Sequence, residues 1–455
     1  MTRAALRSPA VDHPWLLGAA IGVAFGAAAV ASIELALGVL AAPLLLYGFI
    51  RSGVKSEMVV AVFWVSFCLY ETVFAALTLQ GFFYPFYAAF FVSAAVSLLR
   101  TGIRIQAGVL GTYVVFLAVV LVSFVGFTEP IGFEVIQRVF AYVIGLVVML
   151  QFRSWRGIRP VMLATVATGT TIAVWVIATS IQAGFRYRGD IAVDQNVVSF
   201  FIGFGVIVAL AAAADAIATP GRRSRLLVLL LPLGAMLYAL MLLASRGIAL
   251  ALILATAAVV VRALILDRRS LGVVFAVAAI GAGALLLPGS DHLMARFALD
   301  DTETGNRRLP IWEALIDDFV QSDPYTIAVG HGFGSSELVV QRAFGSLTST
   351  HNAFLQILYE FGVVGLASFL GLHVLLLWRA YQLRNGRGLV MFGLLWFLVG
   401  ANLTLNAPDG FMYWTALGVA MALGLWGRAP RRSTEPEAPP VGLHQRAAAG
   451  RALPP

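Results

Sequence analysis

Long apolar runs separated by short polar connections dominate the chain. A helix needs about 20 mainly apolar residues to cross about 30 Å of hydrocarbon, and many runs approach that length. These runs lie near residues 15–31, 33–50, 58–78, 81–99, 107–127, 134–152, 160–182, 195–217, 226–244, 247–266, 271–288, 354–378, 389–407 and 411–427. The pattern predicts an all-α polytopic integral membrane protein with about 12–14 transmembrane helices.

Composition supports a single membrane domain. Of the 455 residues, 60% are apolar and only 12% are charged, whereas soluble domains carry about 25% charged residues. We expect a transmembrane domain over residues 1–428 and a disordered tail over 429–455, which is rich in Pro, Ala and Arg. The single cysteine, Cys68, lies inside an apolar run, which excludes an intramolecular disulfide and favours a small core residue.

Basic residues alternate between the connections and predict the sidedness of the helices. One set of connections takes 23 of the 31 basic residues, including the groups around Arg51, Arg153, Arg222 and Arg379. By the positive-inside rule this set, with both chain termini, is cytoplasmic. The first run has signal-peptide features, but we favour an uncleaved first helix. Because the positive charge is scattered over inner loops without interleaved aromatics, nucleic-acid binding is disfavoured.

One outer connection, residues 289–350, is far longer than the others. Within it, NRRLPIWEALIDDFVQSDP has apolar residues at 309, 312, 315, 316 and 319, which predicts an amphipathic helix along the bilayer surface with Trp312 as interfacial anchor. Loops of this length are usually functional or disordered. We therefore expect a functional periplasmic loop.

The same connection contains two shorter features with open interpretations. GHGFGSSE places Gly332 and Gly334 either in a tight turn or where the backbone approaches a ligand closely. Asp300, Asp301 and Glu303 suggest a cation site, but without ligand geometry a solvated loop is favoured. No metal site is predicted.

Three polar features stand at expected outer helix ends. They are AGFRYRGDIAVDQN with Arg188, LLASRGIALAL with Arg246, and TSTHNAFL with His351. A charge near the membrane centre costs about 2.5–3.5 kcal/mol on insertion scales, so such residues tend to face a cavity or a partner. Arg246 can also snorkel or cap a hairpin, Arg188 can pair with a nearby Asp, and His351 can be a satisfied polar residue. Their common side favours one shared site.

The residue types suit one kind of chemistry. Two guanidinium groups can bind a phosphate or diphosphate through bidentate hydrogen bonds. A neutral histidine can abstract a proton from a hydroxyl. If Thr350 or Ser349 caps the helix, His351 lies in its first turn, where the helix dipole disfavours imidazolium. These features predict transfer from a lipid diphosphate to a hydroxyl at the outer face.

Several motifs resemble the O-antigen ligase and O-antigen polymerase family of membrane glycosyltransferases. HNAFLQILYEFGVVGL resembles the family's pattern of His-Asn, Leu, Glu, Gly and Gly, and SRGIALALILA resembles its Ser-Arg-Gly helix start. RRLPIWEAL with GHGFGSSE resembles its Arg, Trp and Gly-x-Gly stretch. RYRGDIAVDQNVVSF resembles a looser segment, but Gln195 stands where proline is common, so the choice between Arg186 and Arg188 stays open. His331 is an extra titratable group.

The resemblance implies a donor glycan on undecaprenyl diphosphate at the periplasmic face of the bacterial inner membrane. Arg188 and Arg246 would hold the diphosphate, and His351 would activate the acceptor hydroxyl for an inverting attack, with no metal or nucleotide cofactor. Residues with supporting roles would be Arg186, Asn196, Arg308, Trp312, Gly332, Gly334, Asn352 and Glu360.

The acceptor is not determined by these motifs. A ligase would transfer the glycan to another lipid such as lipid A core, and a polymerase would transfer it to a second lipid-linked unit. We favour the ligase. A lipid-linked glycan transporter is less favoured because the polar features collect at one surface, whereas transporters often show broken midplane helices or repeated halves. A non-catalytic scaffold is the remaining alternative.

Overall fold

The computed structural model describes residues 56–69, 72, 90, 107–123, 133–152, 155–183, 194–218, 224–266, 271–291, 308–345, 350–405 and 410–426. Over these residues the chain is helical, without a strand. The helices are α3 (Ser56–Leu69), α5 (Ala107–Ser123), α6 (Phe133–Gln151), α7 (Trp155–Gln182), α8 (Gln195–Ala218), α9 (Ser224–Leu243), α10 (Arg246–Leu266), α11 (Leu271–Leu285), α14 (Arg308–Val320), α15 (Pro324–Val329), α16 (Ser335–Phe344), α17 (Ala353–Gln382), α18 (Gly386–Asn402) and α19 (Phe411–Trp426).

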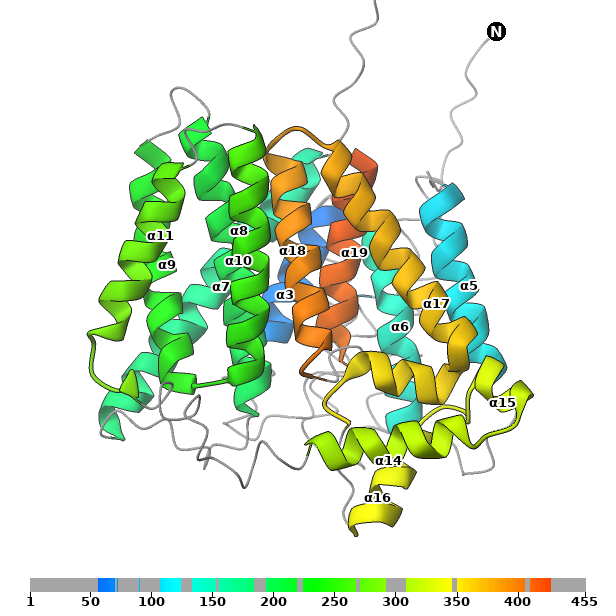
Figure 1. The fold of residues 1–455 in the computed structure, drawn as a ribbon. Helices are drawn as coiled ribbons and strands as arrows, with labels where there is room; N and C mark the ends of the chain where they lie inside the picture. The colour runs from blue at the N-terminus through cyan, green and yellow to red at the C-terminus, as the bar shows by residue number, and fades with distance from the viewer. Residues whose placement is uncertain are drawn as a thin grey trace, which may run out of the picture.

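The long helices form one bundle, and the three short helices α14, α15 and α16 lie together across one end of it (Figure 1). Within the bundle α10 packs along α18, α6 along α19, and α8 against both α7 and α9. The helix α17 packs against α5 and α18. The expected all-α architecture is confirmed.

The observed helices agree with a membrane-spanning bundle. Over the described residues, four helices are long and apolar enough to cross a membrane, namely Gly157–Gln182, Gln195–Ala216, Arg246–Leu266 and Ala353–Gln382. Shorter apolar helices accompany them. The expected spans near 15–31 and 33–50, and that near 81–99 apart from Phe90, lie outside the described residues, as does the tail from 429. The other expected spans each overlap a described helix, and the span near 58–78 is described up to residue 69 and at Thr72.

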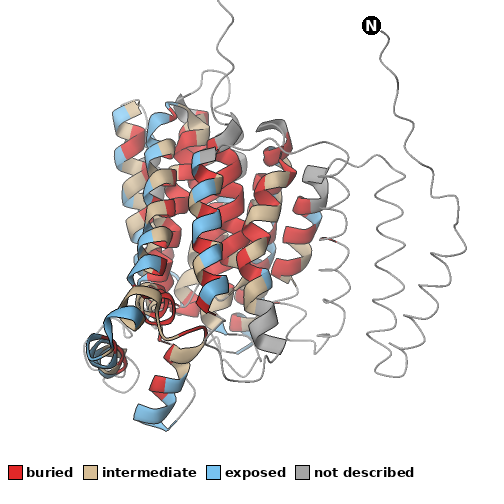
Figure 2. Cartoon of the chain, turned by 90° about the vertical axis from the view of Figure 1, so that its right-hand side faces the viewer, coloured by how far each residue is buried: buried red, intermediate tan, exposed pale blue. Residues whose placement is uncertain are grey.

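The outward faces of the bundle are apolar, as a lipid environment requires. Figure 2 shows buried residues concentrated where helices meet and exposed residues on their outward faces. Large exposed apolar side chains include Leu163, Leu231, Ile253, Phe275 and Val374, from five different helices. Cys68 is buried in α3, as expected for a core residue.

Small residues bring α10 and α18 into close contact. A Cβ atom on Gly400 would lie 2.7 Å from the Ala251 Cα atom, and one on Gly247 would lie 2.6 Å from the Thr404 hydroxyl oxygen. In lipid, helices associate through such close packing because lipid tails are as apolar as the side chains. The contact at Gly247 fixes the start of α10, where Arg246 is the first residue.

The three short helices enclose a small hydrophobic core of their own. Ile311, Leu315 and Phe319 are buried on one face of α14 and pack with Val339 of α16 and Tyr359 of α17. The amphipathic helix was expected from the sequence, but its buried face is different. Leu309 and Ile316 are 58% and 45% exposed, because the buried positions recur every four residues from 311.

Trp312, which the sequence suggested as an interfacial anchor, makes a contact inside the protein that the sequence did not predict. Its indole nitrogen donates a hydrogen bond of 2.9 Å to the Thr350 carbonyl, just before α17. Its ring is partly buried against the small core of α14 and α16. Trp312 therefore ties α14 to the segment that carries His351.

Glycines join the short helices to a break in α17. Gly362 interrupts α17 with φ 66° and ψ −171°, and Gly330 has φ 87°. The backbones touch, since a Cβ on Gly330 would lie 2.2 Å from the Glu360 carbonyl oxygen, and one on Gly362 would lie 2.3 Å from that of Ala328. Backbone hydrogen bonds of 2.9 Å from His331 to Tyr359 and 3.1 Å from Gly332 to Glu360 close the contact.

We expect Gly330→Ala to lower the free energy of unfolding by about 2 kcal/mol or more. A positive φ costs an L-residue about 1–3 kcal/mol, and the new Cβ would also overlap the backbone of α17. Thermal unfolding of the detergent-solubilised protein measures the loss. The matched control is Gly111→Ala in α5, where a Cβ meets open space. Equal melting temperatures for the two variants would contradict the proposed contact.

Candidate functional site

The turn between α9 and α10 places Arg246 at a helix start. Ala244 adopts a left-handed conformation with φ 48°, and the Ser245 carbonyl accepts the first helical hydrogen bond, 3.0 Å from the Ala249 nitrogen. The Ser245 hydroxyl donates to the Asn196 side-chain oxygen at 2.8 Å. Ala244 and Ser245 therefore form a two-residue turn, the Arg-Gly of the motif starts α10, and the serine binds the neighbouring helix α8.

The start of α8 is capped by Asp194. Its carboxylate accepts a 2.8 Å hydrogen bond from the Asn196 nitrogen, and its carbonyl accepts one of 3.0 Å from the Val197 nitrogen. Gln195 is consequently the first residue of the helix, a position that proline also favours because its missing N–H would have no helical partner there. The glutamine in place of the family's proline thus changes a helix start and removes no ligand group.

His351 precedes α17 and lies outside its first turn. Asn352 is the cap, since its side-chain oxygen accepts hydrogen bonds from the Phe354 and Leu355 nitrogens at 3.0 and 3.1 Å. The expectation that Thr350 or Ser349 caps the helix is wrong. His351 adopts a left-handed backbone with φ 51°, which is uncommon for a residue other than glycine. Asn352, expected in a supporting role, is the N-cap of α17.

Charged residues at the starts of α8 and α14 lie close enough to act on His351, and Arg246 at the start of α10 acts on Arg308. Burial lowers the pKa of the half-buried His351 ring, the positive charge of Arg308 lowers it further, and Asp194 acts in the opposite direction. Burial also lowers the pKa of Arg308, and the charge of Arg246 adds to that shift. The ring is therefore held neutral by burial and by Arg308, and the helix dipole is not needed to explain it.

Two neighbouring arginines are suited to binding an anion. Like charges that are close together destabilise each other, and an anion between them removes that cost. A phosphate or diphosphate matches two guanidinium groups because each can donate paired hydrogen bonds. Arg246 comes from α10 and Arg308 from α14, so the anion would bind between the bundle and the short helices.

Two expected residues cannot be placed. Arg186 and Arg188 lie outside the described residues, so the choice between them stays a prediction. The acidic residues Asp300, Asp301 and Glu303 also lie outside them. Asn196 lies beside the site through its hydrogen bond with Ser245.

The remaining support residues fix the backbone around the site. Gly332 has φ 97° and donates to the Glu360 carbonyl, and Gly334 has φ 76° at the start of α16. The fully buried Glu360 carboxylate accepts a 2.6 Å hydrogen bond from the Ser336 hydroxyl. The glycine-rich turn therefore lies close to the backbone of α17. One interpretation of the sequence was that the partner in such a close approach would be a ligand.

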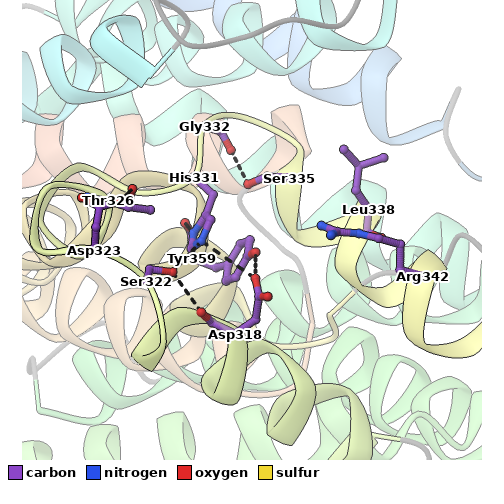
Figure 3. A network of polar contacts seen from close by, with 10 residues as sticks. All are labelled: Asp318, Ser322, Asp323, Thr326, His331, Gly332, Ser335, Leu338, Arg342 and Tyr359. Carbon is purple, nitrogen blue, oxygen red and sulfur yellow. Dashed lines mark hydrogen bonds and ion pairs between the residues drawn. The ribbon is translucent and has the colours of Figure 1, made fainter.

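His331 belongs to a polar network that joins the short helices to α17 (Figure 3). Its ring stacks on Tyr359 with centroids 4.1 Å apart, and the Tyr359 hydroxyl donates to Asp318. Its Nε2 atom lies 2.8 Å from the Ser322 hydroxyl and 3.9 Å from an Asp318 oxygen. In a Ser-His-Asp triad the serine and aspartate bind opposite ring nitrogens. Here both approach the same one, so the network is a structural contact.

Sequence reasoning gave too little weight to two residues. Asp194 was not among the expected site residues, yet its charge acts on His351. Arg308 was assigned a supporting role, yet it interacts with both His351 and Arg246. The available signal was position, because each residue stands at the start of a helix and such starts can share one end of a bundle.

Comparison with known proteins agrees with the motifs. Residues 231–370 match the family model described as O-antigen ligase. The matched segment begins within α9, ends within α17 and includes Arg246, Arg308 and His351. No curated protein matches the chain. Residues 231–370, which supply both arginines and the histidine of the site, are thus a domain of the O-antigen ligase family.

Proposed function

We propose that the protein transfers a glycan from undecaprenyl diphosphate to an acceptor hydroxyl, with lipid A core as the acceptor lipid. The family match supports O-antigen ligase or polymerase chemistry. The observation that carries the specific proposal is the position of Arg308, which acts on both His351 and Arg246. The reaction requires a general base for the acceptor hydroxyl and cationic groups for the leaving diphosphate. His351 would supply the first and the two arginines the second.

In the proposed reaction His351 acts as general base. The neutral ring takes the proton of the acceptor hydroxyl while the acceptor oxygen attacks the anomeric carbon of the donor. The bond from that carbon to the diphosphate oxygen breaks, and the configuration inverts. Asp194 stabilises the imidazolium that forms, because its negative charge favours the protonated ring. The proton then leaves to solvent.

Arg246 and Arg308 stabilise the leaving group. Negative charge develops on the departing diphosphate as the bond breaks, and positioned donors lower the energy of that state more than the energy of the bound donor. Arg188, which the resemblance assigns to the diphosphate, would join them. The positive-inside pattern supports a location of this end of the bundle at the periplasmic face of the inner membrane.

His351→Ala is expected to abolish glycan transfer while the protein remains folded and inserted. In the unmodified protein, transfer requires neutral His351, whose pKa is lowered from its ordinary value of 6.5. Transfer should therefore persist as the pH falls through 6.5 and be lost only at lower pH. The measurement is kcat/KM against pH with reconstituted protein. Full activity of His351→Ala would refute the role of general base.

Asp194→Asn provides a graded test of the same assignment. The amide still caps α8, but it removes the charge that favours protonated His351. The acid limb of the pH profile should move to lower pH, and Arg308→Gln should move it to higher pH. A limb that stays in place in both variants would mean that another group titrates.

Replacing Arg246 or Arg308 by lysine should weaken donor use, because an ammonium group cannot reproduce the paired hydrogen bonds of a guanidinium. We expect kcat/KM for the lipid diphosphate to fall by roughly tenfold or more, equivalent to about 1.4 kcal/mol. The matched control is Arg342→Lys, an exposed arginine of α16 whose Nε atom donates to the Leu338 carbonyl. If all three variants keep the same kcat/KM, the arginines do not bind the diphosphate.

The acceptor can be identified by competition. Reconstituted protein receives one lipid-diphosphate glycan and two acceptors, a lipid A core and a second lipid-linked unit. We expect product on lipid A core, resolved by mass and by extraction behaviour. Extension of the second lipid-linked unit instead would identify a polymerase.

A further inference from the structure

A cavity of about 940 Å³ lies at the end of the bundle opposite His351. It is formed where α8 and α10 end, where α17 ends and where α18 begins, with Asp215, Arg262, Tyr381 and Arg384 among its lining residues. Arg262 lies 16 residues after Arg246 on α10, which corresponds to roughly 24 Å along the helix. The cavity is therefore separate from the site proposed for glycan transfer.

Arg262 is the most unusual residue of this cavity. Its side chain is only 4% exposed, and its guanidinium lies over the Tyr381 ring at 4.3 Å from the centroid. One terminal nitrogen donates to the Tyr381 carbonyl. Its Nε–H finds no acceptor among the residues that the structure describes. A buried charged donor without an acceptor is costly, so an acceptor from a ligand would stabilise this arrangement.

The charges around the cavity favour an anion. Arg384 is close enough to Arg262 for the two positive charges to repel. The acidic residue Asp215 attracts Arg387 and lies against the backbone of Gly386, where a Cβ would be 2.1 Å from its carboxylate oxygen. Arg262 and Arg384 thus face the cavity as a pair whose guanidinium groups suit a phosphate.

The rim of the cavity favours a lipid over a soluble anion. Ile265, Trp378 and Tyr381 line it and are 62%, 59% and 49% exposed. Exposed aromatic side chains at helix ends are typical of the membrane interface, where one edge meets acyl chains and the other meets headgroups. Basic pockets between transmembrane helices on the cytoplasmic side bind anionic headgroups. The basic connection from Arg379 to Arg387 is expected on that side.

We propose that this cavity binds the phosphodiester headgroup of an anionic glycerophospholipid, held between Arg262 and Arg384 with its acyl chains along Trp378 and Ile265. The bound lipid would join the ends of α10, α17 and α18. Since α10 and α17 carry Arg246 and the His351 segment at their other ends, the lipid would stabilise the helices that position these residues without contacting them. This proposal does not depend on the reaction assigned above.

Thermal unfolding of the full-length protein in detergent tests the proposal. Phosphatidylglycerol should raise the melting temperature, and phosphatidylcholine at the same concentration should not. Inorganic phosphate is the third addition, because it shares the phosphate chemistry but lacks acyl chains. If inorganic phosphate stabilises the protein as much as phosphatidylglycerol does, the site binds free phosphate and the lipid proposal is wrong. Equal shifts with both lipids would also overturn it.

Substitutions of the two cavity arginines test whether phosphatidylglycerol binds in this cavity. Arg384→Gln changes an exposed residue and should retain the fold while weakening phosphatidylglycerol binding by roughly tenfold in a lipid titration. Arg262→Gln should weaken binding similarly if it folds. The matched control is Arg342→Gln at the opposite end of the molecule, which should bind the lipid like the unmodified protein. Unchanged binding in Arg384→Gln would refute the assigned cavity.

Discussion

The contact between the Gly330 turn and the break in α17 at Gly362 determines where Arg308 of α14 can lie. Two main chains approach within a distance that no Cβ would allow, and hydrogen bonds from His331 and Gly332 hold them there. The small core around Ile311 and Leu315 then positions α14 on this attachment. The chemistry proposed for Arg308 therefore depends on an interaction made almost entirely by backbone atoms.

The sequence predicts the spans well because the signal is strong and local. A membrane helix requires a long apolar run, because side chains that face lipid must be apolar. The described helices consequently match the expected spans. The motifs also predict roles for Arg246 and His351, because charged or titratable side chains beside a membrane are energetically costly unless they face a cavity or a partner.

Details that depend on neighbours were predicted less well. The cap of α17 is Asn352 because its short side chain reaches two backbone nitrogens, and nothing in the order Thr-His-Asn excludes the preceding threonine. Trp312 binds the Thr350 carbonyl, a partner 38 residues away. The effect of Asp194 on His351 requires that the starts of α8 and α17 meet. Each of these depends on packing between segments that are distant in sequence.

The hydrogen bond from Trp312 to Thr350 has a mechanical consequence. It connects α14, which begins with Arg308, to the short segment that carries His351, whereas Arg246 belongs to a helix packed tightly on α18. Because His351 is also joined to α17 through the cap residue Asn352, α14 cannot move away from the bundle without breaking this hydrogen bond. The bond therefore limits how far Arg308 can move from His351, the two residues that the proposed reaction requires at one site.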